Sequence, residues 1–101
     1  MVTIDEYAAW AARIGPLART TADDPQELAY LGLGLAGETG EAVEHIKKLL
    51  RDGNWSPDGL AEELGDLIYY WARLCLATGR EPSVVLEASQ RKIAERFAAP
   101  R

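Results

Sequence analysis

Apolar residues recur at spacings of three and four in four stretches of the chain, and prolines and glycines separate these stretches. Such spacing is typical of helices with one buried face. The residues at the starts and ends of the stretches are those that favour helix termini. Strand signals are weak, so the pattern predicts an all-α fold, a four-helix bundle in a single domain over residues 1–101. The expected helices run from Thr3 to Gly15-Pro16, from Asp24-Pro25 to Gly53, from Ser56-Pro57 to Gly79, and from Glu81-Pro82 to about Phe97.

The second of these helices is long for so small a chain. At about 27 residues it would extend roughly 40 Å, whereas a compact domain of this size is about 34 Å across. Leucine and alanine side chains would stay uncovered in a monomer, and Gly65, Ala72 and Leu76 form a second small patch on the third helix. Both features predict a homodimer or homotetramer that completes the bundle. The alternative is a monomer whose second helix kinks or breaks at its glycines.

Four glycines fall close together in the second helix: Gly32, Gly34, Gly37 and Gly40. Each costs about 0.5–1 kcal/mol relative to alanine in a helix interior. We expect compensation from the close approach of a neighbouring helix, or from space for a ligand beside acidic side chains.

Charge and composition exclude several classes of function. The chain has 16 acidic residues against 11 lysines and arginines, a formal net charge of −5. This balance argues against general binding to nucleic acid or to anionic membranes, which attract basic surfaces. No apolar run approaches the roughly 20 residues that cross a bilayer, and the first residues lack the pattern of a signal peptide. Cys75, the single cysteine, is expected to be buried in a reducing compartment, so a cytoplasmic location is predicted.

Two pairs of acids carry the clearest functional signal: Glu38 with Glu41, and Glu63 with Asp66. The spacing of three residues places both carboxylates of a pair on one side of a helix. On a helical wheel each pair lies at the margin between the apolar arc and the polar face. Antiparallel packing of the two helices would therefore bring four carboxylates together.

Clustered carboxylates repel one another unless a hard cation or a proton neutralises them. Their oxygens suit Mg²⁺, with Mn²⁺ as a substitute, and such an ion also binds water and phosphates. The pairs therefore predict a metal site and phosphate chemistry, with Glu41 as the candidate base that accepts a proton from water. Glu44 and Glu62 lie nearer the polar face and are interpreted as structural. Glu44 is spaced to pair with Lys48, and Glu62 is a secondary candidate for a second ion.

At these acids the sequence resembles the MazG-like nucleotide pyrophosphohydrolases, an all-α superfamily of NTP pyrophosphatases. Residues 34–41 (Gly-Leu-Ala-Gly-Glu-Thr-Gly-Glu) and 46–48 (Ile-Lys-Lys) match the first half of the family signature. Residues 62–70 (Glu-Glu-Leu-Gly-Asp-Leu-Ile-Tyr-Tyr) match the second half. The resemblance covers nearly the whole chain, because Lys92-Ile93 and Arg96-Phe97 are similar to its closing stretch. The sequence departs from the family pattern at Gly37, where many members have an acid, and at Ser89, where asparagine is common.

The resemblance implies Mg²⁺-dependent hydrolysis of a nucleoside triphosphate to the monophosphate and pyrophosphate, as in the cleaning of nucleotide pools. The motif assigns the metal ligands to Glu38, Glu41, Glu63 and Asp66. The candidates for holding phosphates are Lys48, Lys92 and Arg96. The candidates for stacking on a base are Tyr70, Trp10 and Tyr7, with Trp10 equally suited to a core position. His45, one turn from Glu41, is a candidate either for lining the site or for surface capping.

Other interpretations account for less of the sequence. A di-iron or di-manganese carboxylate bundle needs Glu-x-x-His pairs, and His45, the single histidine, does not follow a glutamate by three residues. Nucleophilic catalysis is disfavoured because Cys75 is expected to be buried on a different helix from His45. The main alternative is a non-catalytic helical module that retains the fold and oligomerises through its apolar faces.

Overall fold

The computed structural model describes residues 1–14 and 24–98. It contains four helices: α1 (Ile4–Ala11), α2 (Pro25–Asp52), α3 (Pro57–Ala77) and α4 (Pro82–Arg96). No strand occurs among the described residues, so the predicted all-α fold is confirmed. Within this part of the chain, no helix has the length and apolar character needed to cross a membrane.

The first three helices begin where the sequence predicts, and side-chain caps explain why. Thr3 and Glu6 form a capping box at α1, in which each side chain accepts a hydrogen bond from the backbone N–H of the other. Asp24 accepts hydrogen bonds from two backbone N–H groups of α2, and Ser56 accepts one from Gly59 in α3. These side chains satisfy donors that have no partner inside a helix.

Glycine ends two helices by adopting a left-handed backbone. Gly53 follows α2 with φ 73°, and Gly79 follows α3 with φ 78°. Both positions were predicted as helix ends, since glycine adopts this conformation without the steric penalty of a side chain. Helix α1 ends at Ala11, before the predicted Gly15-Pro16, which lies outside the described residues.

A residue distant in sequence caps α4. Its N-cap Glu81 makes no side-chain capping bond. Instead Asp5 of α1 accepts hydrogen bonds from the backbone N–H of Ser83 (2.9 Å) and from its hydroxyl (2.5 Å). A carboxylate near a helix N-terminus is also favoured by the helix dipole. The two bonds fasten α4 to α1.

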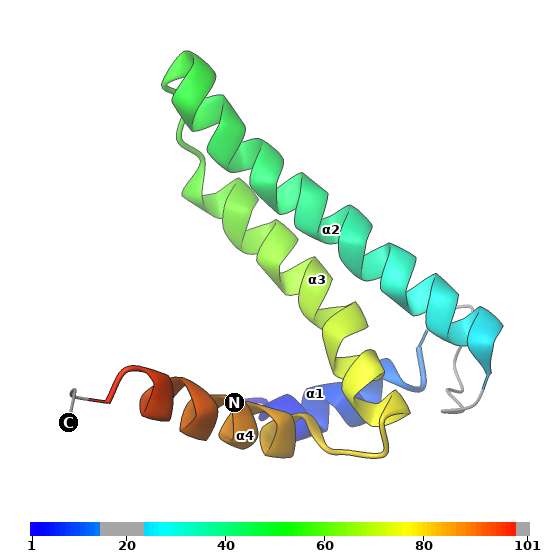
Figure 1. Cartoon of the computed structure of the whole chain (residues 1–101). Helices are drawn as coiled ribbons and strands as arrows, with labels where there is room; N and C mark the ends of the chain where they lie inside the picture. The colour runs from blue at the N-terminus through cyan, green and yellow to red at the C-terminus, as the bar shows by residue number, and fades with distance from the viewer. Residues whose placement is uncertain (15–23, 99–101) are drawn as a thin grey trace.

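Helices α2 and α3 form a long antiparallel hairpin, and α1 and α4 lie across the end of α3 away from the hairpin turn (Figure 1). Within the described residues, the backbone of α2 packs beside that of α3 but not beside those of α1 or α4. Helix α2 runs unbroken through its glycines, so the alternative of a break in this helix is wrong. The position of α1 relative to the acids of α2 is therefore set through α3.

The core is small and lies near the junction of α1, α3 and the first half of α2. Its fully buried residues include Ala8, Ala11, Leu31 and Ala72, and Cys75 is also buried, as predicted. Because Ala72 is buried by this chain alone, it does not belong to the free surface patch expected on the third helix. Burial also raises the pKa of the Cys75 thiol, which keeps it protonated and unreactive.

Candidate metal centre and adjoining pocket

Three of the four predicted acids converge on one point between α2 and α3. Glu38, Glu41 and Glu63 each offer a carboxylate oxygen, and these oxygens all lie within 4.8 Å of one another. The two helices achieve this because Glu38 and Glu41 share a side of α2 that faces α3. Asp66 is outside this group of three, but its charge acts on Glu63 and its side chain lines a cavity with Glu38.

Glu63 is the most perturbed member of the cluster. Its Oε2 atom is buried without a hydrogen-bond partner. Burial raises the pKa of Glu63 to about 7, and a hydrogen bond with Glu41 and the negative charges of Glu41, Glu38 and Asp66 contribute to the rise. A cation would relieve this repulsion and provide the buried oxygen with a partner. The donor set, all carboxylate oxygens, fits a hard divalent ion such as Mg²⁺.

The raised pKa of Glu63 predicts a stability that depends on pH in the metal-free protein. Between its ordinary value of 4.5 and its folded value of about 7, Glu63 binds more protons in the folded state than in the unfolded state. Its stabilising contribution is therefore complete below pH 4.5 and is lost as the pH rises through about 7. Thermal unfolding in a chelator at pH 5 and pH 8 measures this loss.

Glu63→Gln is the matched control, because glutamine keeps the shape and does not titrate. The wild-type protein should lose stability relative to this variant between pH 5 and pH 8. Adding Mg²⁺ or Mn²⁺ at pH 8 should restore the wild-type protein more than the variant. Parallel pH profiles for the two proteins would contradict the assigned environment of Glu63.

An aromatic pocket of about 320 Å³ adjoins the acid cluster. Its size is within the range of small-molecule sites. Glu38 and Asp66 form its acidic side, and its remaining lining residues are Tyr7, Trp10, Ile14, Tyr69 and Tyr70. Aromatic faces of this kind can stack against a flat ring, and this pocket lies directly beside the acids. The structure thus gathers Tyr7, Trp10 and Tyr70 as the sequence analysis suggested, although their binding role stays a prediction.

Tyr70 owes its place in this pocket to a glycine. A Cβ atom at Gly34 would overlap Cε1 of Tyr70, so only glycine leaves room for the ring in this position. Close packing therefore explains Gly34. At Gly32, Gly37 and Gly40 nothing lies within 4 Å of such an atom, so close approach of a neighbouring helix in this chain does not explain them. Space for a ligand beside Glu38 and Glu41 stays a prediction.

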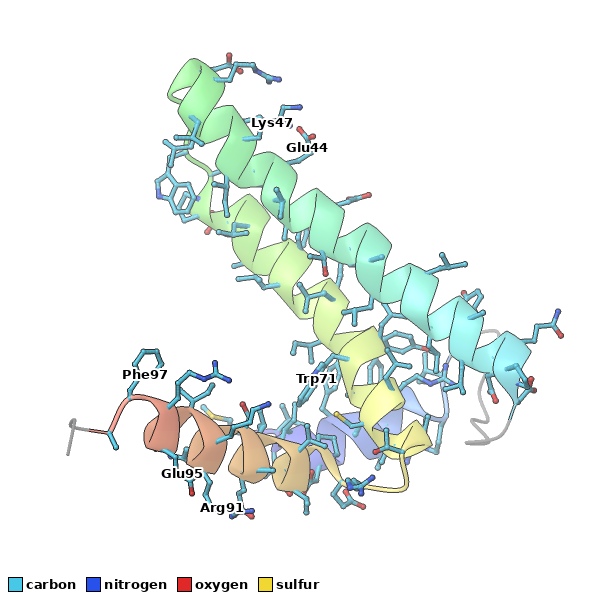
Figure 2. The ribbon with its side chains drawn as sticks, viewed as in Figure 1. Glu44, Lys47, Trp71, Arg91, Glu95 and Phe97 are labelled. Atoms are coloured by element: carbon cyan, nitrogen blue, oxygen red, sulfur yellow. The ribbon has the colours of Figure 1, made fainter. Side chains whose placement is uncertain are left out.

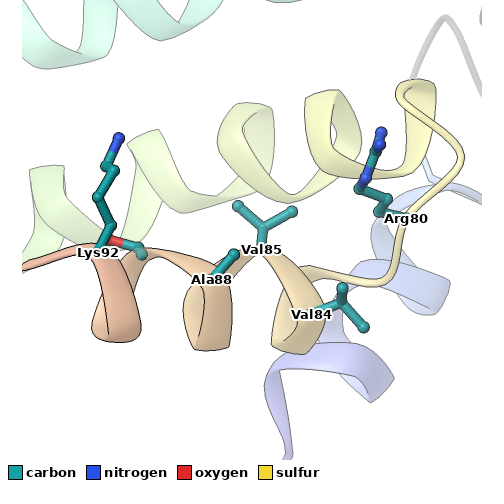
Figure 3. A pocket seen from close by; sticks show the side chains of 6 residues that line it. Arg80, Val84, Val85, Ala88 and Lys92 are labelled. Atoms are coloured by element: carbon teal, nitrogen blue, oxygen red, sulfur yellow. The ribbon is translucent and has the colours of Figure 1, made fainter. Parts of the chain in front are cut away.

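The chain does not bring the predicted phosphate-binding cations to the acid cluster. Lys48 is exposed near the end of α2, and Arg96 is exposed at the end of α4. Lys92 lines a separate cavity of about 360 Å³ with Arg80 and Ser89, and Lys92 and Arg80 stand at its two ends (Figure 3). This cavity shares no lining residue with the aromatic pocket. Contact of these cations with phosphates stays a prediction.

The structure gives two other polar residues specific neighbours. His45 packs against Gly59 near the start of α3: its Cε1 is 2.6 Å from the position that a Cβ of Gly59 would take. Glu44 pairs with Lys47 at 3.9 Å rather than with Lys48. Both partners are exposed on α2 (Figure 2), so this ion pair adds little to stability.

Sequence analysis missed Tyr69 and Ile14 as pocket residues. Tyr69 follows Asp66 by three residues, so the spacing that grouped the acids could also have placed Tyr69 beside them. Ile14 has no such signal, because it reaches the pocket only through the packing of α1 on α3.

The site consists of two antiparallel helices, acids that converge between them, and a pocket beside these acids. These features define a class of all-α proteins whose clustered carboxylates can hold a divalent cation. The sequence narrows this class. Residues 26–98 match the profile of the MazG nucleotide pyrophosphohydrolase domain, and the chain belongs to this family. The resemblance noted in the sequence, and the fold that it implied, are therefore confirmed.

A curated protein provides a partial match. The chain is 40% identical over 57 residues to the Gene 37 protein of Mycobacterium phage L5. This match covers 52% of the chain and 50% of the phage protein, so the chain spans about half the length of that relative. No solved structure matches the chain.

Proposed function

We propose that the protein is a Mg²⁺-dependent pyrophosphohydrolase that cleaves nucleoside or deoxynucleoside triphosphates to the monophosphate and pyrophosphate. The observation that carries this proposal is the convergence of three carboxylate oxygens within 4.8 Å at one side of an aromatic pocket. Membership of the MazG family supports it. Cleaning of the nucleotide pool is the biological role that such an activity would serve.

The four acids are the proposed metal ligands, and Glu41 is also the proposed base. Glu38, Glu41, Glu63 and Asp66 would hold Mg²⁺, and Mn²⁺ would substitute for it. The bound ion would neutralise phosphate charge and make a coordinated water more acidic. Glu41 is exposed and lies beside Glu63 in the cluster, so its carboxylate can accept a proton from water there.

The aromatic pocket would hold the nucleobase while the acids face the phosphates. Tyr70 of α3 and Trp10 of α1 both line the pocket, and their aromatic faces are the proposed contacts for the base. Glu38 and Asp66 link the two parts of the site, since both line the pocket and both act on Glu63. Lys48, Lys92 and Arg96 are the proposed phosphate contacts.

A panel of canonical and modified nucleoside triphosphates, assayed for pyrophosphate, tests the proposed function. The expected result is release that requires Mg²⁺ or Mn²⁺ and stops in EDTA, with one base or sugar preferred. Release of inorganic phosphate without pyrophosphate would contradict the proposed cleavage. No release from any substrate would favour the alternative of a non-catalytic oligomerisation module.

The surface of the isolated chain supports self-association into a homodimer or homotetramer. Its radius of gyration is 16.1 Å, whereas a compact chain of this length has about 13 Å. Its accessible surface is 7251 Å², roughly 1,600 Å² more than the scaling for an 11.1 kDa monomer gives. A standard interface buries about 800 Å² on each partner, so this excess is enough for a stable interface.

A second copy would cover exposed apolar residues of this chain. Leu33 and Leu50 of α2 are 74% and 83% exposed, and Phe97 after α4 is 77% exposed. An apolar cavity of about 450 Å³ opens between α3 and α4, where Trp71 lies (Figure 2). Because α4 does not contact α2 in the described residues, a second copy would also offer a route by which Lys92 or Arg96 reaches the acids.

Leu50→Glu is expected to shift the protein from an oligomer toward the 11.1 kDa monomer, because a charge would be buried in the interface. Lys47→Glu introduces the same side chain three residues away on α2, at a position already charged and exposed. It should leave the mass unchanged. Light scattering after size exclusion measures both variants, and a wild-type protein that is monomeric at all concentrations would contradict self-association.

A further inference from the structure

A buried ion pair joins α2 and α3 next to Tyr69, one of the residues that line the aromatic pocket. Arg73 of α3 is 0% exposed and Glu27 of α2 is 5% exposed, which makes them the buried charged residues of the described chain. Nη2 of Arg73 lies 3.8 Å from Oε1 of Glu27. Replacement of such a pair by apolar residues is often neutral for stability, so stability alone gives little reason for its presence. Its neighbours indicate what it does.

The ion pair continues into a chain of hydrogen bonds that ends at α1. Nη1 of Arg73 donates a hydrogen bond of 3.0 Å to the hydroxyl of Tyr69. That hydroxyl donates in turn to the backbone carbonyl of Ile14, at 2.6 Å. The guanidinium also lies 5.7 Å from the centre of the Tyr69 ring, within the range of a cation–π contact. Polar contacts thus run without interruption from α2 through α3 to the residues that follow α1.

This chain of contacts matters for the pocket because the backbones of α1 and α2 do not pack side by side within the described residues. The pocket needs both helices: Tyr7, Trp10 and Ile14 come from α1 and its end, and Glu38 comes from α2. Their relative placement depends on α3, where Tyr69 both lines the pocket and holds Ile14. The Tyr69 ring is fixed further by edge-to-face contact with Tyr70, with 5.1 Å between ring centres.

We propose that Tyr69 is a positioning residue, whose hydroxyl, oriented by Arg73 and Glu27, holds the end of α1 in place and so sets the width of the aromatic pocket beside the acids. This inference rests on the proposed function in one respect, that the pocket binds the base of the substrate. The hydroxyl acts through Ile14 and α1, and it has no part in holding the metal. Buried polar networks that link several elements favour one arrangement of those elements.

Tyr69→Phe tests the proposal, because it keeps the ring and removes both hydrogen bonds of the hydroxyl. With Mg²⁺ and the preferred triphosphate, KM should rise about three- to tenfold, the loss expected for the one hydrogen bond that holds Ile14. The value of kcat should stay within about twofold, and Mn²⁺ affinity should not change. Circular dichroism checks that the variant keeps its helix content.

Ser83→Ala is the matched control at the opposite end of α1. It removes the hydrogen bond from the Ser83 hydroxyl to Asp5 and touches no residue of the pocket. General loosening of α1 would raise KM in both variants, whereas positioning by Tyr69 would raise it in Tyr69→Phe alone. An equal rise in both variants, or an unchanged KM in Tyr69→Phe, overturns the proposal.

Hydrogen exchange separates this proposal from the proposed function, because it needs no enzymatic activity. The amides of Ala12 and Ile14 close the last turns of α1 by bonding to Ala8 and Ala11. Tyr69→Phe should speed their exchange about three- to tenfold and leave the amide of Tyr7, at the start of the helix, unchanged. If the wild-type protein hydrolyses no triphosphate, the proposed function fails and these exchange rates alone decide the role of Tyr69. Unchanged exchange at Ala12 and Ile14 overturns that role.

Discussion

Glu38→Gln is expected to lower pyrophosphate release by at least about 100-fold while leaving the helix content of the protein unchanged. Glu38 has this effect because it belongs to both parts of the site: its oxygen is one of the three within 4.8 Å, and its side chain lines the aromatic pocket. Glutamine keeps the shape and one acceptor oxygen but removes the charge that a divalent ion requires. Asp66→Asn should act in the same direction, through its charge beside Glu63.

Glu44→Gln is the control for these variants. It makes the same chemical change on the same helix, at an exposed position where the side chain pairs only loosely with Lys47. It should leave activity within about twofold of the wild type. Retention of activity in Glu38→Gln, or an equal loss in Glu44→Gln, would falsify the assignment of the acid cluster as the active centre. Circular dichroism and unfolding in urea test whether loss of folding causes the loss of activity.

Gly34→Ala is expected to destabilise the protein by about 1–3 kcal/mol, because the new methyl group would overlap the ring of Tyr70. Gly32→Ala, two residues earlier on the same helix, is expected to stabilise the protein by about 0.5–1 kcal/mol, since nothing lies within 4 Å of its new atom. Unfolding in urea measures both changes.

The opposite signs of these two effects make the pair informative. Helix propensity alone would stabilise both variants, so a stabilised Gly34→Ala protein would show that Tyr70 does not occupy the described position. In an active enzyme, displacement of Tyr70 by Gly34→Ala should also raise KM, whereas Gly32→Ala should not change it.

Features that depend on neighbours in sequence could be predicted from the sequence. Asp24 and Ser56, each followed directly by proline, cap α2 and α3, and Gly53 ends α2. These features could be predicted because a cap depends only on the side chain and backbone of the residues next to it. The meeting of Glu38 and Glu41 with Glu63 was also predictable. Their spacing of three residues fixes a side of each helix, and a short turn forces the two helices to pack antiparallel.

Features that depend on the packing of distant segments could not be predicted in this way. The bonds from Ser83 to Asp5 join residues 78 positions apart, and the bond from Tyr69 to Ile14 joins residues 55 positions apart. Helical periodicity says which face of a helix is buried, but it does not say which other helix covers that face. For the same reason the sequence left open whether His45 lines the site or caps the surface, whereas it packs on Gly59. Nothing in the sequence indicated that α4 stays away from α2.

Titration of the metal-free protein with Mn²⁺, followed by the loss of the electron paramagnetic resonance signal of the free ion, tests the central claim most directly. The claim is that side chains of α2 and α3 together bind a divalent cation. We expect saturable uptake by the wild-type protein, competition by Mg²⁺, and loss of uptake in both Glu38→Gln and Glu63→Gln, which lie on different helices. No saturable uptake by the wild-type protein, even with nucleotide present, or undiminished uptake by both variants, would contradict the claim.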